Sequence, residues 1–207
     1  MADDMPLAHA QAFAGKLQPG SAPALLLVDM VVAYLDPGSP LYCETAPAAL
    51  AAAARLLAAA REAGRPIAFT NVAYQPGGAD GGLFYRKVPA LRLFEAGGAL
   101  GAFPTEASPL AGEGVFTKQY PSAFFGTEFG DWLTERDVDT VVICGYSTSG
   151  CVRASALDTL QHGFVPLVVR DGCADRDPGP HEANLYDLQA KYAEVIGVDQ
   201  ALSVLRG

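Results

Sequence analysis

The sequence has no run of basic residues and no long apolar stretch. It carries 14 Lys and Arg against 23 Asp and Glu, for a formal net charge of −9 at pH 7. A chain this acidic is poorly suited to nucleic acid or to an anionic membrane surface, so neither is expected as a partner. No apolar stretch approaches the roughly 20 residues that span a bilayer. The first residues, MADDMPLAHA, carry acids where a signal peptide has bases. We therefore expect a cytoplasmic protein.

Histidine is also scarce. Only His9, His162 and His181 are present, and none lies between the first two. This distribution disfavours a histidine-built metal site near the first strands, and it confines any histidine-dependent triad to residues late in the chain. The four cysteines match no zinc-binding spacing and are expected to be reduced: Cys43, Cys144, Cys151 and Cys173. We expect neither a metal nor another cofactor.

Hydrophobic residues make up 50% of the chain, which is enough for a sizeable core. A single domain over residues 1–207 is expected, with residues 1–22 as an N-terminal extension. Apolar segments predict strands at residues 24–29, 66–72, 115–118, 141–144, 164–170 and 194–197. Helical patterns lie at residues 47–63, 84–94, 127–136, 151–162, 182–194 and 200–205. This alternation predicts an α/β fold whose parallel sheet is covered on both faces.

Three polar residues fall at or just past the ends of predicted strands: Asp29, Lys118 and Cys151. Ligands of such sheets bind beyond the carboxyl ends of the strands, so these side chains are expected to meet. Cys151 follows a strand and opens a predicted helix, where unpaired N–H groups and the helix dipole favour a thiolate. Taken singly, each residue also has an ordinary structural role: a strand-terminal cap, a solvated charge or a packed cysteine.

Together these residues have the chemistry of a cysteine hydrolase. Asp29 can act as the base and Lys118 as the adjacent cation, while the thiolate of Cys151 attacks an amide carbonyl. Backbone N–H groups of Ser147 and Cys151 can bind the oxyanion. Asp29 can then protonate the leaving amine and activate water for hydrolysis of the thioester. No histidine is needed.

The segments LLLVDM, FTKQYPSAFFGT and VVICGYSTSGCVRASALDTLQHGF occur in this order. With them the chain resembles the isochorismatase-like cysteine hydrolase superfamily over nearly its whole length. The resemblance implies a three-layer, Rossmann-like α/β fold with a central six-stranded parallel sheet of order 3-2-1-4-5-6. It implies an Asp29-Lys118-Cys151 triad and a cis peptide between Tyr146 and Ser147. It also implies a homo-oligomer, often a tetramer.

The segments GCVRAS, DGCADRD and GPHEANLYDLQAKYAEV look most like those of maleamate amidohydrolases and N-carbamoylsarcosine amidases. This resemblance implies that Arg176, Ser147 and Thr148 bind the carboxylate of a small anionic amide. Maleamate is the expected substrate and N-carbamoylsarcosine the alternative. Related nicotinamidases bind a metal through histidines after the first strand, and those histidines are absent here.

Other interpretations remain open at this stage. Residues 145–149 approach the G-x-S-x-G pattern of a serine hydrolase, with Ser147 as nucleophile and His162 or His181 as its partner. A thiol-based redox sensor or binding module would use Cys151 but would leave Asp29 and Lys118 unexplained. Arg176 has a structural alternative in a salt bridge to one of three neighbours: Asp171, Asp175 or Asp177. Four aromatic residues could close the pocket or belong to the core: Tyr34, Phe84, Tyr120 and Phe124.

Overall fold

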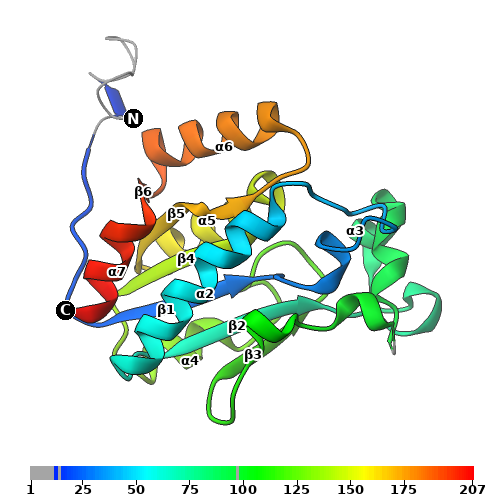
Figure 1. Cartoon of the computed structure of the whole chain (residues 1–207), viewed down its shortest axis with the longest axis horizontal. Coiled ribbons are helices and arrows are strands. Elements are labelled where there is room, and N and C mark those ends of the chain that lie inside the picture. Colours follow the sequence, from blue (N-terminus) through cyan, green and yellow to red (C-terminus); the bar gives the residue numbers. More distant parts are fainter. Residues whose placement is uncertain (1–11, 14, 97) are drawn as a thin grey trace.

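The computed structural model describes residues 12–13, 15–96 and 98–207. Its centre is a six-stranded, all-parallel sheet of order β3-β2-β1-β4-β5-β6 (Figure 1). The strands are β1 (Pro23–Val28), β2 (Ile67–Val72), β3 (Gly114–Lys118), β4 (Thr140–Tyr146), β5 (Val165–Ala174) and β6 (Glu194–Ile196). The predicted fold class and strand order are confirmed.

Helices cover both faces of the sheet. The α-helices are α2 (Ala46–Glu62), α3 (Gly82–Lys87), α4 (Phe129–Thr134), α5 (Arg153–Gln161), α6 (Pro178–Lys191) and α7 (Val198–Arg206). Five 3-10 turns are η2 (Val32–Tyr34), η3 (Pro76–Gly78), η4 (Pro89–Phe94), η5 (Ala99–Gly101) and η6 (Thr105–Ala107), and one π turn is η7 (Thr148–Val152). Figure 1 shows α2 and α7 in front of the sheet and α4 behind it.

The two helical layers bury opposite faces of the same strands. Leu25 and Leu27 of β1 pack in the cluster that includes α2 and α7. Leu26 and Val28 pack in the cluster that includes α4, α5 and α6. Alternate side chains of a strand point to opposite faces, so a strand between two layers must be apolar throughout. The continuous apolar run before Asp29 therefore identifies a central strand.

Two strands extend further than predicted. β4 continues through Gly145, where the apolar run was expected to break, and β5 continues to Ala174 instead of ending at Arg170. Gly145 has φ 141°, and a Cβ there would lie 2.1 Å from the carbonyl oxygen of Val28. The glycine thus lets β1 and β4 approach closely, and it does not end the strand.

Two helical segments also differ from the prediction. Residues 84–94 form α3 and η4 in place of one helix, because Val88 precedes a proline and adopts an extended conformation (φ −117°, ψ 94°). Helix α6 begins at Pro178, earlier than the predicted start at Glu182. The carboxylate of Asp177 caps it by accepting the N–H of Gly179 at 2.9 Å.

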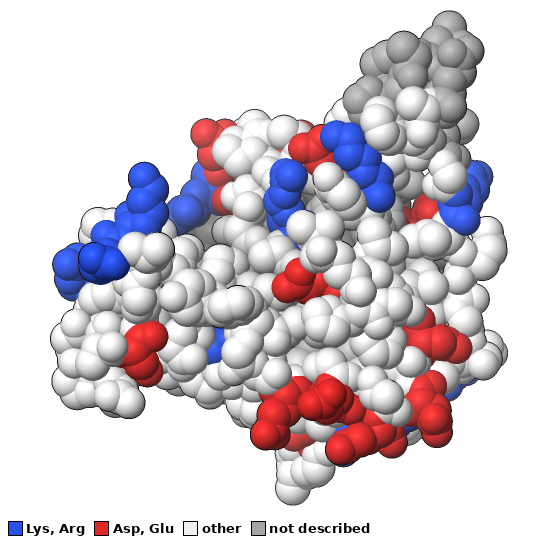
Figure 2. All heavy atoms as spheres, turned by 180° about the vertical axis from the view of Figure 1, so that it is seen from behind, with Lys and Arg blue, Asp and Glu red and all other residues white. Residues whose placement is uncertain are grey.

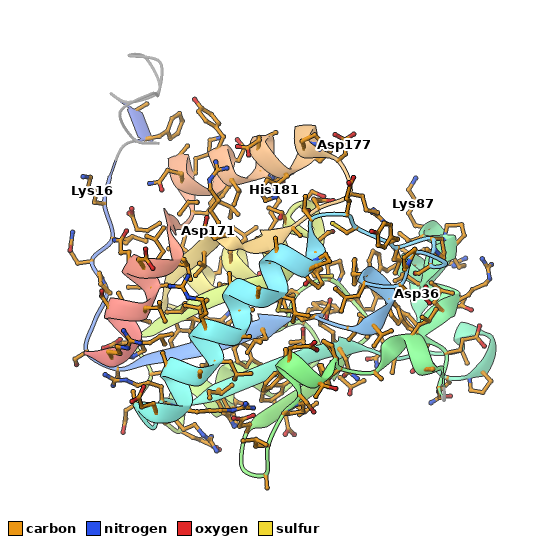
Figure 3. The ribbon with its side chains drawn as sticks, in the orientation of Figure 1. Lys16, Asp36, Lys87, Asp171, Asp177 and His181 are labelled. Atoms are coloured by element: carbon orange, nitrogen blue, oxygen red, sulfur yellow. The ribbon has the colours of Figure 1, made fainter. Side chains whose placement is uncertain are left out.

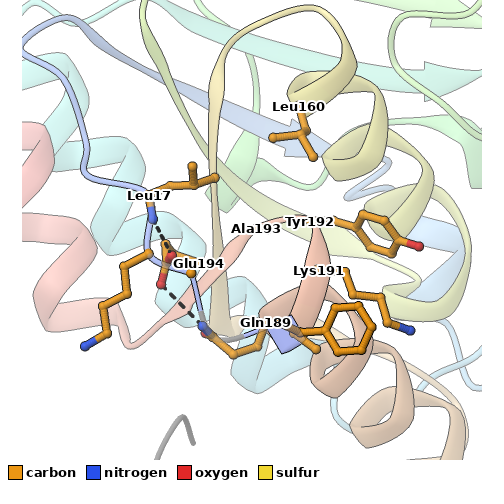
Figure 4. A pocket seen from close by; sticks show the side chains of 11 residues that line it. Leu17, Leu160, Gln189, Lys191, Tyr192, Ala193 and Glu194 are labelled. Carbon is orange, nitrogen blue, oxygen red and sulfur yellow. Dashed lines mark hydrogen bonds between the residues drawn. The ribbon is translucent and has the colours of Figure 1, made fainter. Parts of the chain in front are cut away.

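Part of the predicted extension packs on the amino end of the sheet. The N–H of Leu17 donates to Oε1 of Glu194 at 2.7 Å (Figure 4), and the N–H of Gly20 donates to Oγ1 of Thr140 at 2.8 Å. Residues 15–22 thus run beside the starts of β4 and β6. Residues 1–11 and 14 of that extension lie outside the described residues. Within the residues that the structure does describe, no helix has the length and apolar character to cross a bilayer.

Candidate active site

Asp29 and Lys118 form a buried ion pair at the carboxyl ends of β1 and β3. Nζ of Lys118 lies 2.7 Å from Oδ2 of Asp29, and their side chains are 0% and 3% exposed. The hydroxyl of Thr70, on β2, donates to the other carboxylate oxygen at 2.7 Å. Buried charges are tolerated when they are paired and hydrogen-bonded. Both carboxylate oxygens of Asp29 meet that condition.

Cys151 completes the group from the turn that follows β4. It lies in η7, is buried, and places Sγ 3.5 Å from Nζ of Lys118. The structure therefore brings together the three residues that the sequence placed at strand ends. The peptide between Tyr146 and Ser147, just before this turn, is cis, as the resemblance implies.

Lys118 remains an ammonium ion in this setting. Burial alone would lower its pKa, but the neighbouring Asp29 carboxylate and Cys151 raise it, and the net direction is upward. Its ammonium group also donates to the carbonyl oxygen of Tyr120 at 3.1 Å. Lys118 is therefore a fixed positive charge, not a proton carrier.

The Cys151 thiol departs from the prediction that its position favours a thiolate. Burial raises the pKa of Cys151 to about 12, and the charge and hydrogen bonding of Asp29 add to this effect while Lys118 opposes it. The turn is also a π turn, where the sequence predicted the first turn of an α-helix. Desolvation thus outweighs the cation, and the thiol keeps its proton at neutral pH until a base removes it.

A pocket of about 210 Å³ borders the Asp29-Lys118-Cys151 group. Asp29, Cys151 and Ser147 line it, together with the side chain of Arg176. Much of its wall is apolar and comes from α3, η4 and the residue between them, through Phe84, Val88, Leu91 and Phe94. A mostly apolar pocket with a few convergent polar groups is the usual form of a small-molecule site.

The Arg176 guanidinium has no ion-pair partner among the described residues. The three acidic neighbours that could have neutralised it, Asp171, Asp175 and Asp177, each accept backbone N–H groups. The salt-bridge alternative is therefore disfavoured. An exposed arginine that lines a pocket and whose guanidinium has no ion-pair partner can bind an anion from solution.

Ser147 and Thr148, both expected to bind substrate, differ in their position relative to the pocket. Ser147 lines the pocket, whereas Thr148 is fully buried and does not. The Thr148 hydroxyl lies 2.8 Å from Nδ1 of His181, whose place on α6 Figure 3 shows. Ser149 and Gly150 line the pocket instead. The N–H of Val152 bonds to the Ser147 carbonyl, five residues back, and this wider π turn changes which residues face the site.

The isochorismatase domain profile matches residues 23–200. The chain belongs to the isochorismatase family. Over 188 residues it is 48% identical to maleamate amidohydrolase of Pseudomonas putida, covering 90% of this chain and 88% of that protein. Over 191 residues it is 32% identical to N-carbamoylsarcosine amidase of an Arthrobacter species, covering 90% and 72%.

A solved structure gives the same fold at low sequence identity. The cysteine hydrolase of Pseudomonas syringae pv. phaseolicola 1448A superposes with a TM-score of 0.86 at 19% identity, covering 93% of this chain and 96% of that one. As a member of the isochorismatase family, the chain is a hydrolase.

The serine-nucleophile alternative finds no support in this isochorismatase-family structure. His181 bonds to Thr148, and His162 is exposed, lies 2.8 Å from the Asp158 carbonyl and stacks on Phe124. Neither histidine lines the pocket that contains Ser147. His9 lies outside the residues described.

Two of the four aromatic residues considered for the pocket line it, Tyr34 and Phe84. Phe124 packs in the core against Phe129, and Tyr120 contributes its carbonyl oxygen to the Lys118 ammonium. Across residues 12–13, 15–96 and 98–207, no three His, Cys, Asp or Glu side chains gather in a way that could hold a metal ion.

Proposed function

We propose that the chain is a cysteine-dependent amidohydrolase that releases ammonia from a small linear amide bearing a carboxylate. The observation that carries this proposal is the buried Asp29-Lys118-Cys151 group beside a pocket that Arg176 also lines. Maleamate is the first choice of substrate, supported by the 48% identity to a maleamate amidohydrolase. N-carbamoylsarcosine is the second, supported by the relative at 32% identity.

The reaction begins with attack by sulfur. Because the thiol is protonated, Asp29 takes its proton as Sγ of Cys151 bonds to the amide carbon. The carbonyl electrons move to oxygen, and backbone N–H groups of Ser147 and Cys151 stabilise the resulting oxyanion. The Lys118 charge stabilises the Asp29 carboxylate before the transfer and the negative charge that develops on sulfur.

Two further proton transfers complete the cycle. As the oxyanion collapses, the C–N bond breaks and Asp29 returns its proton to nitrogen, so ammonia leaves and a thioester remains. Asp29 then takes a proton from water while the water oxygen attacks the thioester carbon. The C–S bond breaks, the sulfur regains a proton from Asp29, and the acid product leaves.

Substrate binding divides between charge and shape. The planar Arg176 guanidinium suits a carboxylate, and the Ser147 hydroxyl can add a hydrogen bond. Thr148, expected to bind substrate as well, has its hydroxyl committed to His181 and serves in this proposal by holding the turn to α6. The apolar wall from α3 and η4 accommodates the hydrocarbon part of the substrate.

Ammonia release from a panel of amides tests the proposal. Maleamate, N-carbamoylsarcosine, ureidoacrylate and nicotinamide are compared, with Cys151→Ala as the variant expected to lose turnover by roughly 10⁴-fold or more. Cys144→Ala, in the core, is expected to lower stability while activity persists. Activity in Cys151→Ala would contradict the mechanism.

Arg176→Ala tests the carboxylate anchor. Loss of a charge-assisted hydrogen bond is expected to raise KM for carboxylated amides by about 10-fold to 150-fold. Arg176→Lys should restore only part of this loss, because a point charge does not reproduce the guanidinium fork. The control is the diamide analogue of the substrate, in which an uncharged amide replaces the carboxylate. If both substrates weaken equally, Arg176 supports the loop and does not bind the carboxylate.

Three further properties belong to this proposal. We expect activity to persist after exhaustive chelation, because the protein supplies its own nucleophile. A homotetramer is expected, and light scattering on the purified protein tests it. A cytoplasmic location is expected, and cell fractionation tests it.

A further inference from the structure

Tyr34 has a buried hydroxyl without a partner. It ends the turn η2 and is 8% exposed, and it lines the same pocket as Asp29, Cys151 and Arg176. Its hydroxyl makes no hydrogen bond to any described residue. Buried polar groups are normally paired, so such a hydroxyl facing a pocket indicates a contact with a ligand.

Other buried tyrosines of this chain show the usual arrangement. The Tyr146 hydroxyl donates to the Ala46 carbonyl at 2.7 Å, and the Tyr74 hydroxyl donates to the Gln119 carbonyl at 2.9 Å. Tyr34 differs from these two because its hydroxyl has no hydrogen-bond partner among the described residues. It is also the one of the three that lines the pocket.

The ring of Tyr34 is held in place. Its centroid lies 5.1 Å from that of Tyr146, with an interplanar angle of 43°. Its backbone N–H donates to the Val31 carbonyl at 3.2 Å, and its carbonyl accepts the N–H of Cys43 at 3.0 Å. A hydroxyl on a fixed ring loses little conformational entropy when it binds a ligand.

The Tyr34 hydroxyl is a donor at neutral pH. Burial raises the pKa of Tyr34 well above its ordinary value, and the neighbouring acidic groups of Cys151 and Asp29 raise it further while Arg176 lowers it. A protonated phenol near an unpaired guanidinium complements an anionic acceptor.

We propose that the Tyr34 hydroxyl donates a hydrogen bond to the substrate carboxylate, as a second anchor beside Arg176. This inference rests on the proposed function, and it makes Tyr34 a determinant of specificity for anionic amides. Two anchors on separate elements, η2 and the loop before α6, fix the distance between the carboxylate and the reacting carbonyl. The pair thus selects substrates by length as well as by charge.

Tyr34→Phe is the test, with the full-length protein. We expect kcat/KM for the carboxylated amide to fall about tenfold or more, mainly through KM, because one hydrogen bond to an anion is lost. The value for the uncharged diamide should change by less than about twofold. The melting temperature should not fall, since the variant removes a hydroxyl that has no partner in the protein. Tyr42→Phe, a partly exposed tyrosine outside the pocket, is the matched control.

Equal losses for the charged and uncharged substrates, or a lower melting temperature with unchanged discrimination, would overturn the proposal. A binding measurement separates it from the proposed function. Maleate, a dicarboxylate probe, is titrated by calorimetry into wild type and Tyr34→Phe, and the variant should bind about tenfold more weakly. Equal affinity, or no binding to wild type, rejects the Tyr34 anchor. Tyr34-dependent binding without hydrolysis of any amide rejects only the proposed function.

Discussion

At the scale of residues, the site depends on the environment of one carboxylate. Asp29 accepts hydrogen bonds from Lys118 and Thr70 and raises the pKa of the Cys151 thiol beside it. The same group that removes the proton during attack therefore also keeps the thiol protonated beforehand. Lys118 opposes this effect on the thiol and pairs with Asp29 at 2.7 Å.

Asp29→Asn should separate these two roles. Loss of the carboxylate charge lowers the Cys151 pKa from about 12, so alkylation by iodoacetamide at pH 8 should become faster while amide hydrolysis is lost.

In the wild type, the rate of alkylation of Cys151 should rise about tenfold per pH unit between pH 8 and 11, because the thiolate fraction rises at that rate below the pKa.

Mass spectrometry assigns the modified cysteine. Cys43, Cys144 and Cys173 are buried outside the pocket and serve as internal controls. Slower alkylation of Cys151 in Asp29→Asn would show that the carboxylate does not hold the proton on sulfur.

The meeting of Asp29, Lys118 and Cys151 was predictable from the sequence, because parallel strands bring their carboxyl ends to one edge. The thiol pKa was not, because it depends on desolvation by side chains distant in the chain. The unpaired state of the Tyr34 hydroxyl was also not predictable from the sequence, since it depends on which groups of the folded protein surround the ring. Arg176 was predicted to bind the substrate carboxylate only because of the family resemblance.

At the scale of elements, β4 and η7 together aim the nucleophile. Pairing of β4 with β5 changes register between Ile143 and Gly145, and the π turn begins three residues later. The sequence indicated a strand, a glycine and a helix. It did not indicate the register shift beside Gly145, which lies against Val28 of β1, or the wider turn, whose Thr148 contacts His181 of α6. For the same reason, Thr148 was expected in the pocket that Ser149 lines.

Gly145→Ala should destabilise the segment formed by β4 and η7. A methyl group would meet the Val28 carbonyl oxygen at 2.1 Å in a backbone conformation with φ 141°, so we expect a loss of about 3 kcal/mol or more in the free energy of unfolding. Urea denaturation measures it. Gly64→Ala is the control, because Gly64 has φ 63° and open space around it, and its replacement should cost about 1 kcal/mol. Similar losses in the two variants would argue against the close approach of β1 and β4.

At the scale of the whole molecule, charge is unevenly distributed. The net charge is −9, yet Arg86, Lys87 and Arg92 are exposed on α3 and η4, the elements that form the apolar wall of the pocket. Figure 2 shows one group of basic side chains at the left of the view and others near the top and at the upper right, while many acidic side chains lie along the lower edge. Lys87 is labelled at the α3 end in Figure 3. This arrangement favours approach of an anion to an otherwise acidic protein.

Ionic strength should reveal this attraction. Raising it from about 20 to 200 mM shortens the Debye length to below about 10 Å, so kcat/KM for the carboxylated amide should fall severalfold, while that for the uncharged diamide should not change. The double variant Arg86→Glu and Lys87→Glu should lose most of this salt dependence, whereas Lys191→Glu on α6 should keep it. Identical salt profiles for the two substrates would show that the basic residues do not attract the substrate.

The contact between Leu17 and Glu194 has a consequence for the order in which the protein acquires its structure. The two residues are 177 positions apart, so the segment around Leu17 can find its partner only after all of the intervening chain has been synthesised. β1 likewise pairs with β2 early but with β4 much later. The nascent chain therefore leaves the backbone N–H and C=O groups on one edge of β1 unpaired until β4 emerges, and residues 15–22 likewise wait for Thr140 and Glu194.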